Sequence, residues 1–154
     1  MDSTRLLNDG ARALAHGNDL DTTLRAILVA LGDALDVGSS AVFAADPDGS
    51  LSLVASTGLG EAAAAALADA VANPAHPVAR TAADPVAAFD VLPMAPGGPA
   101  LRSHVPLVVT RDGTETVLGV LALAHDRWLD GERAGIQAAA DLAAVALERH
   151  LPRT

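Results

Sequence analysis

Histidine and arginine are the side chains in this sequence best suited to bind an acidic or polar ligand. The five histidines are well separated: His16, His76, His104, His125 and His150. No two of them are three or four residues apart, and no HExxH motif occurs, so a single helix cannot present two of them to a metal ion. We therefore expect no metal site. The G-x-S-x-G motif of a nucleophile elbow is also missing, so we expect no acyl-transfer activity.

A strand–turn–strand pattern between Leu101 and Asp126 brings three basic residues together. Asp112-Gly113 suits a two-residue type I′ turn, because both central residues of that turn adopt positive φ. Counting outward from this turn, Arg102 falls opposite Leu123 and His104 falls opposite Leu121. Because side chains alternate along each strand, Arg102, His104 and His125 are then predicted to lie on one face, at one end of the sheet.

We predict that these three residues border a ligand pocket covered by the loop 92–99. Arginine suits a carboxylate or a phosphate, because its guanidinium donates two parallel hydrogen bonds. The pocket would then take an acidic or polar ligand. The alternative is a strand end at which the polar groups simply reach water. The other ligand-binding candidates are His76, at the start of a short predicted helix, and three apolar residues for which core packing is the alternative: Phe43, Phe89 and Met94.

The acidic, cysteine-free composition excludes several classes of function. The net charge is −9 over 154 residues, which argues against binding to nucleic acid or anionic membranes, since both attract a basic surface. No lysine is present to form a Schiff base or to serve a P-loop. Without cysteine there is no disulfide, thiolate nucleophile or zinc–thiolate site. The sequence lacks a signal-peptide pattern and any apolar run long enough to cross a bilayer, so we expect a cytoplasmic protein.

The spacing of apolar residues predicts an α+β domain in which helices cover an antiparallel sheet. We expect one domain over 1–154, with N-terminal helices in 1–37, a sheet with inserted helices in 38–126, and a C-terminal helix in 127–150. Two hairpins and a short strand near 86–91 suggest five to six strands. Helices are predicted over 4–15, 20–35, 61–72, 76–83 and 130–150. Asn18 or Asp19 is the expected cap of the second helix.

The order of these motifs resembles the GAF domain family. The central stretch carries Pro106-Leu107 in one strand and Gly119-Val120-Leu121 in the next, and the aromatic Trp128 precedes the last helix. The helix LDTTLRAILVALGDAL, the hairpin after it and the segment His76-Pro77-Val78-Ala79 also follow the family's order. Arg133 departs from the pattern, since an apolar residue is usual at that place.

The resemblance implies a PAS-like architecture, with N- and C-terminal helices on one face of the sheet and a helix–loop segment crossing the other. It implies a sensory or regulatory module that dimerises through its terminal helices and acts on an effector domain or partner protein outside this chain. Ligands in the family include cyclic nucleotides, bilins, haem and small metabolites. The lack of cysteine excludes thioether attachment of a bilin and the cysteine chemistry of the free methionine sulfoxide reductases.

Two functions follow from this reasoning. The first is a non-catalytic sensory domain that binds a small ligand between the sheet and the crossing segment, and signals through its terminal helices. The second is a ligand-free dimerisation module whose pocket is filled by side chains. The sequence identifies neither the ligand nor a cofactor.

Overall fold

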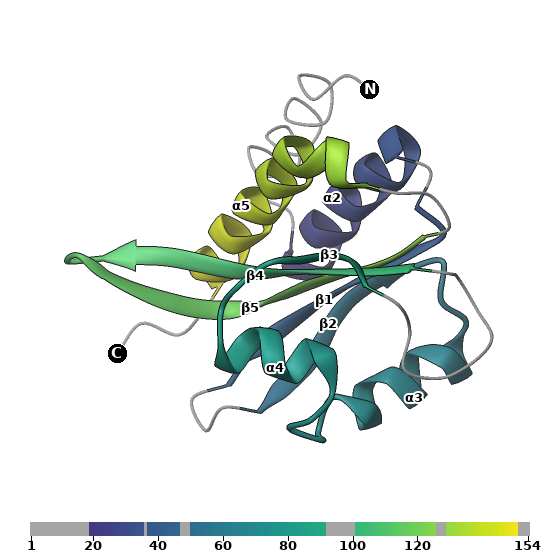
Figure 1. The fold of residues 1–154 in the computed structure, drawn as a ribbon, viewed down its shortest axis with the longest axis horizontal. Helices are drawn as coiled ribbons and strands as arrows, with labels where there is room; N and C mark the ends of the chain where they lie inside the picture. The colour runs from purple at the N-terminus through teal and green to yellow at the C-terminus, as the bar shows by residue number, and fades with distance from the viewer. Residues whose placement is uncertain (1–18, 36, 47–49, 92–100, 126–128, 151–154) are drawn as a thin grey trace.

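The structure, a computed structural model, describes residues 19–35, 37–46, 50–91, 101–125 and 129–150. Four α-helices and five strands are described in it (Figure 1). In chain order the elements are α2 (Leu20–Leu35), β1 (Ser39–Ala45), β2 (Leu51–Thr57), α3 (Glu61–Ala70), α4 (Pro77–Ala83), β3 (Ala88–Val91), β4 (Leu101–Arg111), β5 (Thr114–His125), the 3-10 turn η1 (Asp130–Glu132) and α5 (Arg133–His150). The predicted helix over 4–15, the loop 92–99 and Trp128 lie outside the described residues.

The strands form one antiparallel sheet in the order β2-β1-β5-β4-β3. This confirms the predicted α+β class with five to six strands. β4 and β5 are the longest strands, and the tip of their hairpin extends beyond the rest of the sheet (Figure 1). Asp112 (φ 51°) and Gly113 (φ 77°) form the turn of this hairpin. Both lie in the left-handed region that a type I′ turn requires, so the predicted turn is confirmed.

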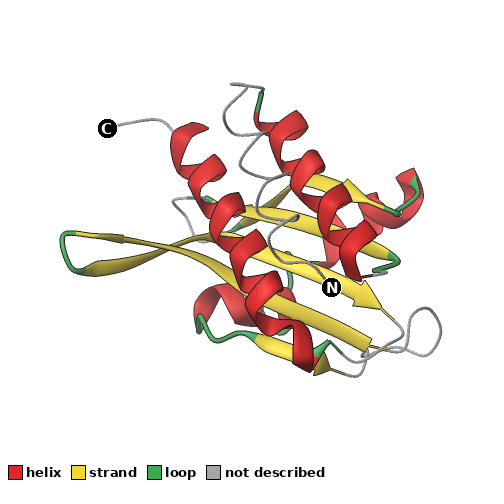
Figure 2. Ribbon diagram, turned by 90° about the horizontal axis from the view of Figure 1, so that it is seen from above, coloured by secondary structure: helices red, strands yellow, loops and turns green. Residues whose placement is uncertain are grey.

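Helices cover both faces of the sheet (Figures 1 and 2). α2 and α5 pack against each other on one face, which we call the α2/α5 face. α3 and α4 lie on the other, the α3/α4 face. The expected arrangement, with terminal helices on one face and a crossing segment on the other, is therefore confirmed. No helix in the described part of the chain is both long enough and apolar enough to span a membrane.

α2 and α5 each bury the apolar stripe that the spacing of their apolar residues predicts. Residues three and four apart share one side of a helix, and that side is buried against the sheet. In α2 and α5 the buried residues include Leu24, Ile27, Leu28, Leu31, Leu35, Ile136, Ala139, Ala140, Ala143 and Leu147. A smaller core lies on the α3/α4 face and contains Ala41, Phe43, Val71, Val78 and Val120.

Several predicted boundaries differ from the structure by a few residues. α3 ends at Ala70 rather than 72, and β3 begins at Ala88 rather than 86. The last helix opens with η1 before α5 begins at Arg133. These differences are of the size expected where helix ends change to 3-10 geometry.

Gly119 allows the central strands β1 and β5 to pair closely. A Cβ atom at this position would collide with the backbone carbonyl of Phe43 on β1. Glycine is therefore required by close approach of two backbones, and not by an unusual backbone angle. The Gly-Val-Leu motif thus has a direct structural reason in this chain.

Candidate functional site

β4 presents Arg102 and His104 to the α3/α4 face of the sheet. The two residues are two positions apart on one strand, so their side chains point to the same side. They pair with Ala124 and Ala122 on β5. Ala122 packs with Phe43 in the core beneath α3 and α4, which identifies the face. His104 is buried there and Arg102 is half-buried.

The turn before α4 adds His76 to this face. His76 is the N-cap of α4, and its Nδ1 accepts a hydrogen bond of 3.2 Å from the backbone N–H of Val78. This bond satisfies one of the N–H groups that the first turn of a helix leaves without a partner. Because Nδ1 is the acceptor, the neutral ring carries its proton on Nε2. α4 packs against both β4 and β5, so His76 comes near enough to act electrostatically on His104.

Burial keeps His104 neutral near pH 7. Desolvation is the largest cause of the lowering of its pKa from 6.5 to about 4, and charges on His76, Arg102 and His125 act in the same direction. The physical reason is that a low dielectric penalises the protonated form. The pKa of His76 is also lowered by burial. On this face Arg102 therefore places a permanent cation near two imidazoles that can donate or accept a hydrogen bond.

Phe43 supplies the apolar surface beside these polar groups. Its ring is fully buried and packs in the cluster that includes Val78 and Val120, between the sheet and α4. Arg102, His104, His76 and Phe43, four of the seven predicted site residues, thus lie on the α3/α4 face. Their contact with a ligand stays a prediction.

A β-bulge in the central hairpin changes the register that the sequence predicts. The pairing shifts just after Leu107, and Leu118 is left as an additional residue on β5. After one additional residue in a strand, each later side chain of that strand points to the opposite face from the one that the regular pairing predicts. Arg102 consequently pairs with Ala124 and not with the predicted Leu123.

His125 therefore lies on the α2/α5 face, and the prediction that it shares a face with Arg102 and His104 is wrong. Its Nε2 lies 2.8 Å from Oγ of Ser103. The two side chains are 1% and 0% exposed. This buried hydrogen bond joins β5 to β4 on the side of the strand opposite to the candidate site.

Phe89 also lies on the α2/α5 face, so it does not line a pocket with Phe43, and it packs against the core as the alternative expectation had it. The guanidinium Cζ of Arg133 stands 4.7 Å from the centre of the Phe89 ring, a cation–π contact. This contact gives Arg133, which departs from the GAF pattern, a defined role at the start of α5. Met94 lies outside the described residues.

The outer side of α2 carries an open depression that the sequence analysis missed. Its volume is about 550 Å³, and it is lined by Asp21, Thr22, Arg25, Ala26, Val29, Ala30 and Asp33. It lies on the opposite side of the sheet from Arg102 and His104. The signal in the sequence is a row of small and apolar residues on the helix side that faces away from the leucine stripe.

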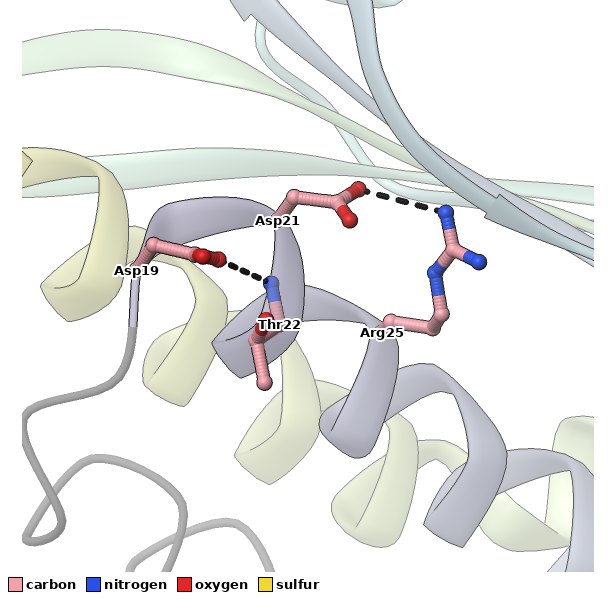
Figure 3. Close-up of polar contacts among 4 residues, drawn as sticks. All are labelled: Asp19, Asp21, Thr22 and Arg25. Atoms are coloured by element: carbon pink, nitrogen blue, oxygen red, sulfur yellow. Dashed lines mark hydrogen bonds and ion pairs between the residues drawn. The ribbon is translucent and has the colours of Figure 1, made fainter.

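Polar contacts order the first turns of this side of α2 (Figure 3). Asp19 Oδ1 accepts a hydrogen bond of 2.8 Å from the backbone N–H of Thr22, so Asp19, one of the two predicted candidates, caps the helix. Arg25 Nη2 lies 3.4 Å from Asp21 Oδ1. Since both of these side chains are more than half exposed, the ion pair contributes little to stability. Among the described residues no group of three His, Cys, Asp or Glu side chains could hold a metal ion.

A match to a protein-family model decides the identity of the fold. The GAF domain model matches residues 19–147, from the cap of α2 to near the end of α5. This chain belongs to the GAF domain family. GAF domains are generally sensory or regulatory modules. Comparison with curated proteins gives no match.

Solved structures share the fold of this GAF domain at low sequence identity. The GAF domain of an Acinetobacter phosphoenolpyruvate-protein phosphotransferase matches with a TM-score of 0.70 and 13% identity, over 94% of this chain and 91% of that one. A methyl-accepting chemotaxis protein matches with a TM-score of 0.63 and 23% identity, over 91% and 94%. Free methionine-R-sulfoxide reductase from Neisseria meningitidis, solved with its substrate, matches with 0.70 and 13%, over 95% and 88%. Because one fold serves a chemotaxis protein and an enzyme, the function of this GAF domain has to be argued from its own residues.

Proposed function

We propose that this GAF domain is a non-catalytic, cytoplasmic sensory domain that binds a small acidic or polar ligand on its α3/α4 face. Occupancy would pass through the terminal helices to an effector domain or partner protein outside this chain. The observation that supports this most strongly is the gathering of Arg102, His104 and His76 beside an apolar core. The similar folds of a chemotaxis protein and of a putative two-component sensor histidine kinase from Sinorhizobium meliloti agree with a sensory role.

Because the chain carries a net negative charge, an anion would have to be attracted by a nearby cation and not by the protein as a whole. At a net charge of −9 the protein as a whole repels anions. An acidic ligand therefore needs a nearby cation that is partly shielded from water, where electrostatic attraction is stronger. Arg102 is half-buried and always charged, and so meets this need. The neutral imidazole of His104 adds a hydrogen-bonding group without the cost of a second buried charge.

The proposal of a non-catalytic domain follows from the placement of the reactive side chains. The chain has no cysteine, so it cannot carry out the cysteine chemistry of a methionine sulfoxide reductase. Ser103 and His125 do form a hydroxyl–imidazole pair. That pair lies on the α2/α5 face, on the opposite side of β4 from the candidate ligand-binding groups, and its two side chains are hydrogen-bonded to each other in the core.

Thermal unfolding with a panel of small anions tests the proposal. The panel contains succinate, citrate, inorganic phosphate, AMP and cyclic GMP, each tested on the wild type, Arg102→Ala and the control Arg25→Ala, which removes an exposed arginine of α2. A ligand present at a hundred times its Kd stabilises a protein by about 2.7 kcal/mol, which raises Tm by several degrees. We expect such a rise in the wild type and the control, and its loss in Arg102→Ala. A rise that persists in Arg102→Ala, or no rise with any compound, would contradict the proposal.

The open side of α2 favours a second function, a dimerisation module whose partner is another copy of this chain. Val29 is 49% exposed at the middle of the depression. Arg25 and Asp33 lie four residues before and after it. Two α2 helices packed antiparallel about Val29 would therefore place each Arg25 opposite Asp33 of the other copy, as a two-fold interface requires. Ala26 and Ala30 are small enough to let the helices approach closely.

A further inference from the structure

We propose that β3 transmits ligand occupancy at Arg102 and His104 to the start of α5, through the contact between Phe89 and Arg133. This inference rests on the proposed function, because it takes the α3/α4 face as the ligand site. It adds a route by which one face of the sheet controls a helix on the other face.

β3 pairs directly with both candidate ligand-binding residues. Ala88 pairs with His104, and Val91 pairs with Arg102. Three steps along β3 thus correspond to two steps along β4, so β3 carries a bulge beside the site. Bulges change the direction of a side chain and increase the local twist of a strand. A displacement of β4 at Arg102 or His104 therefore acts on β3 at Val91 or Ala88.

Phe89 lies inside this bulge and connects it to the opposite face. Its ring is half-buried against the core on the α2/α5 face. Arg133 is the first residue of α5, and its Cζ is 4.7 Å from the centre of that ring. β3 consequently makes two contacts. Its backbone pairs with the site residues of β4, and its Phe89 side chain contacts Arg133 in the first turn of α5.

β3 is well placed to shift between two positions. It has four residues, lies at the edge of the sheet and, among the described strands, pairs only with β4. Short segments with few partners open at a lower free-energy cost than central strands. A ligand held by Arg102 and His104 fixes β4, and with it the bulge of β3. Phe89 then stays beneath Arg133 and the first turn of α5 is stabilised, which is a shift between populations that already exist.

The contact between Phe89 and Arg133 is weak enough to form and break reversibly. Arg133 is exposed, and an exposed cation–π pair is worth a factor of about two to five in an equilibrium. Loss of the contact should therefore loosen the first turn of α5 without unfolding the domain. Binding at the site should change the opening of that turn by a similar factor.

Amide hydrogen exchange in residues 137–140, whose N–H groups donate to the carbonyl groups of the first turn of α5, measures this coupling without any ligand. We expect Arg102→Ala, which alters the site, to speed exchange at these amides about two- to fivefold, the factor set by the strength of the contact. Arg133→Gln and Phe89→Leu should each do the same, since Gln has no charge and Leu fills the space without an aromatic face. In an Arg133→Gln background, Arg102→Ala should add nothing. His104→Gln serves as a second change at the site, and Arg25→Gln should leave exchange in residues 137–140 unchanged.

Two results would overturn the inference. One is unchanged exchange at residues 137–140 when Arg102 and His104 are each replaced. The other is an equal effect of Arg102→Ala with and without the Arg133 side chain, since the coupling would then use a different route. Because these comparisons need no ligand, they can succeed or fail separately from the ligand screen. If succinate or another anion of the panel binds, it should slow exchange in the wild type and have no such effect in Arg133→Gln.

Discussion

The hydroxyl oxygen of Ser103 lies 2.8 Å from Nε2 of His125 in the core beneath α5. Its neighbours on β4, Arg102 and His104, point to the opposite face of the sheet. The strand thus separates a buried structural pair on one side from the candidate ligand-binding groups on the other. Substitutions at adjacent positions should therefore have different consequences.

Ser103→Ala should destabilise the domain without affecting ligand binding. The change removes a buried hydrogen-bond partner of His125, and such a loss costs about 1–3 kcal/mol. Urea denaturation monitored by circular dichroism measures the difference in unfolding free energy. Ser52→Ala is the control, because its hydroxyl donates to Asp46 on the exposed surface. Equal stability of Ser103→Ala and the wild type would contradict the role assigned to the buried pair.

Gly119→Ala should be strongly destabilising, whereas Gly32→Ala should be neutral or stabilising. A Cβ at 119 collides with the backbone of Phe43, while a Cβ at 32 stands 3.7 Å from the carbonyl oxygen of Val37, an ordinary contact. Overpacking of this kind costs about 1–3 kcal/mol. Replacing a helical glycine by alanine gains up to about 1 kcal/mol. Thermal unfolding of the two variants tests both statements, and similar Tm values would refute the argument from close approach.

His104 should make the stability of the domain depend on pH between 6.5 and about 4. Its pKa is lower in the folded protein, so the unfolded chain binds more protons in this range and stability falls as the pH falls. The contribution is complete above pH 6.5 and lost near pH 4, and it amounts to up to about 3 kcal/mol. His104→Gln should lose less stability than the wild type over this range. Parallel pH profiles for the two proteins in urea denaturation would show that His104 is not responsible.

Charge exchange on α2 tests the dimerisation function. Arg25→Glu places like charges opposite each other in the antiparallel arrangement, and Asp33→Arg in the same chain restores the attraction. Each exposed pair is worth up to about 1 kcal/mol, and a two-fold interface contains two of them. Sedimentation equilibrium should therefore show weaker self-association for Arg25→Glu and recovery in the double variant. Equal self-association of all three proteins would exclude this surface as the interface.

The features that the sequence predicted correctly depend on local patterns. The leucine stripe of α2 follows from the helical period, and the turn at Asp112-Gly113 follows from the residues that tolerate positive φ. In both cases a few neighbouring residues determine the outcome. The close approach of Gly119 to Phe43, in contrast, was not predicted, because it involves a residue of another strand.

The incorrect predictions concern features that depend on distant partners. The additional residue Leu118 lies just before the stretch 119–124 of β5 that pairs with both β1 and β4. The neighbouring Gly119 is a glycine inside a strand, which indicates either a bulge or a close backbone approach and does not distinguish between the two. A single additional residue moved His125 to the other face. The face of Phe89 also depends on a distant partner, because Ala88 pairs with His104 on β4 and the next residue, Phe89, therefore points to the α2/α5 face.

The ligand site on the α3/α4 face is tested most directly by calorimetric titration. The titrant is any compound of the anion panel that stabilises the wild type, and the proteins are the wild type, Arg102→Ala and Arg25→Ala. A hydrogen bond to a charged group contributes about 1.5–3 kcal/mol, so we predict a Kd at least about tenfold higher for Arg102→Ala. Arg25→Ala should bind like the wild type. Equal affinity of the wild type and Arg102→Ala would contradict the assignment of this face as the ligand site.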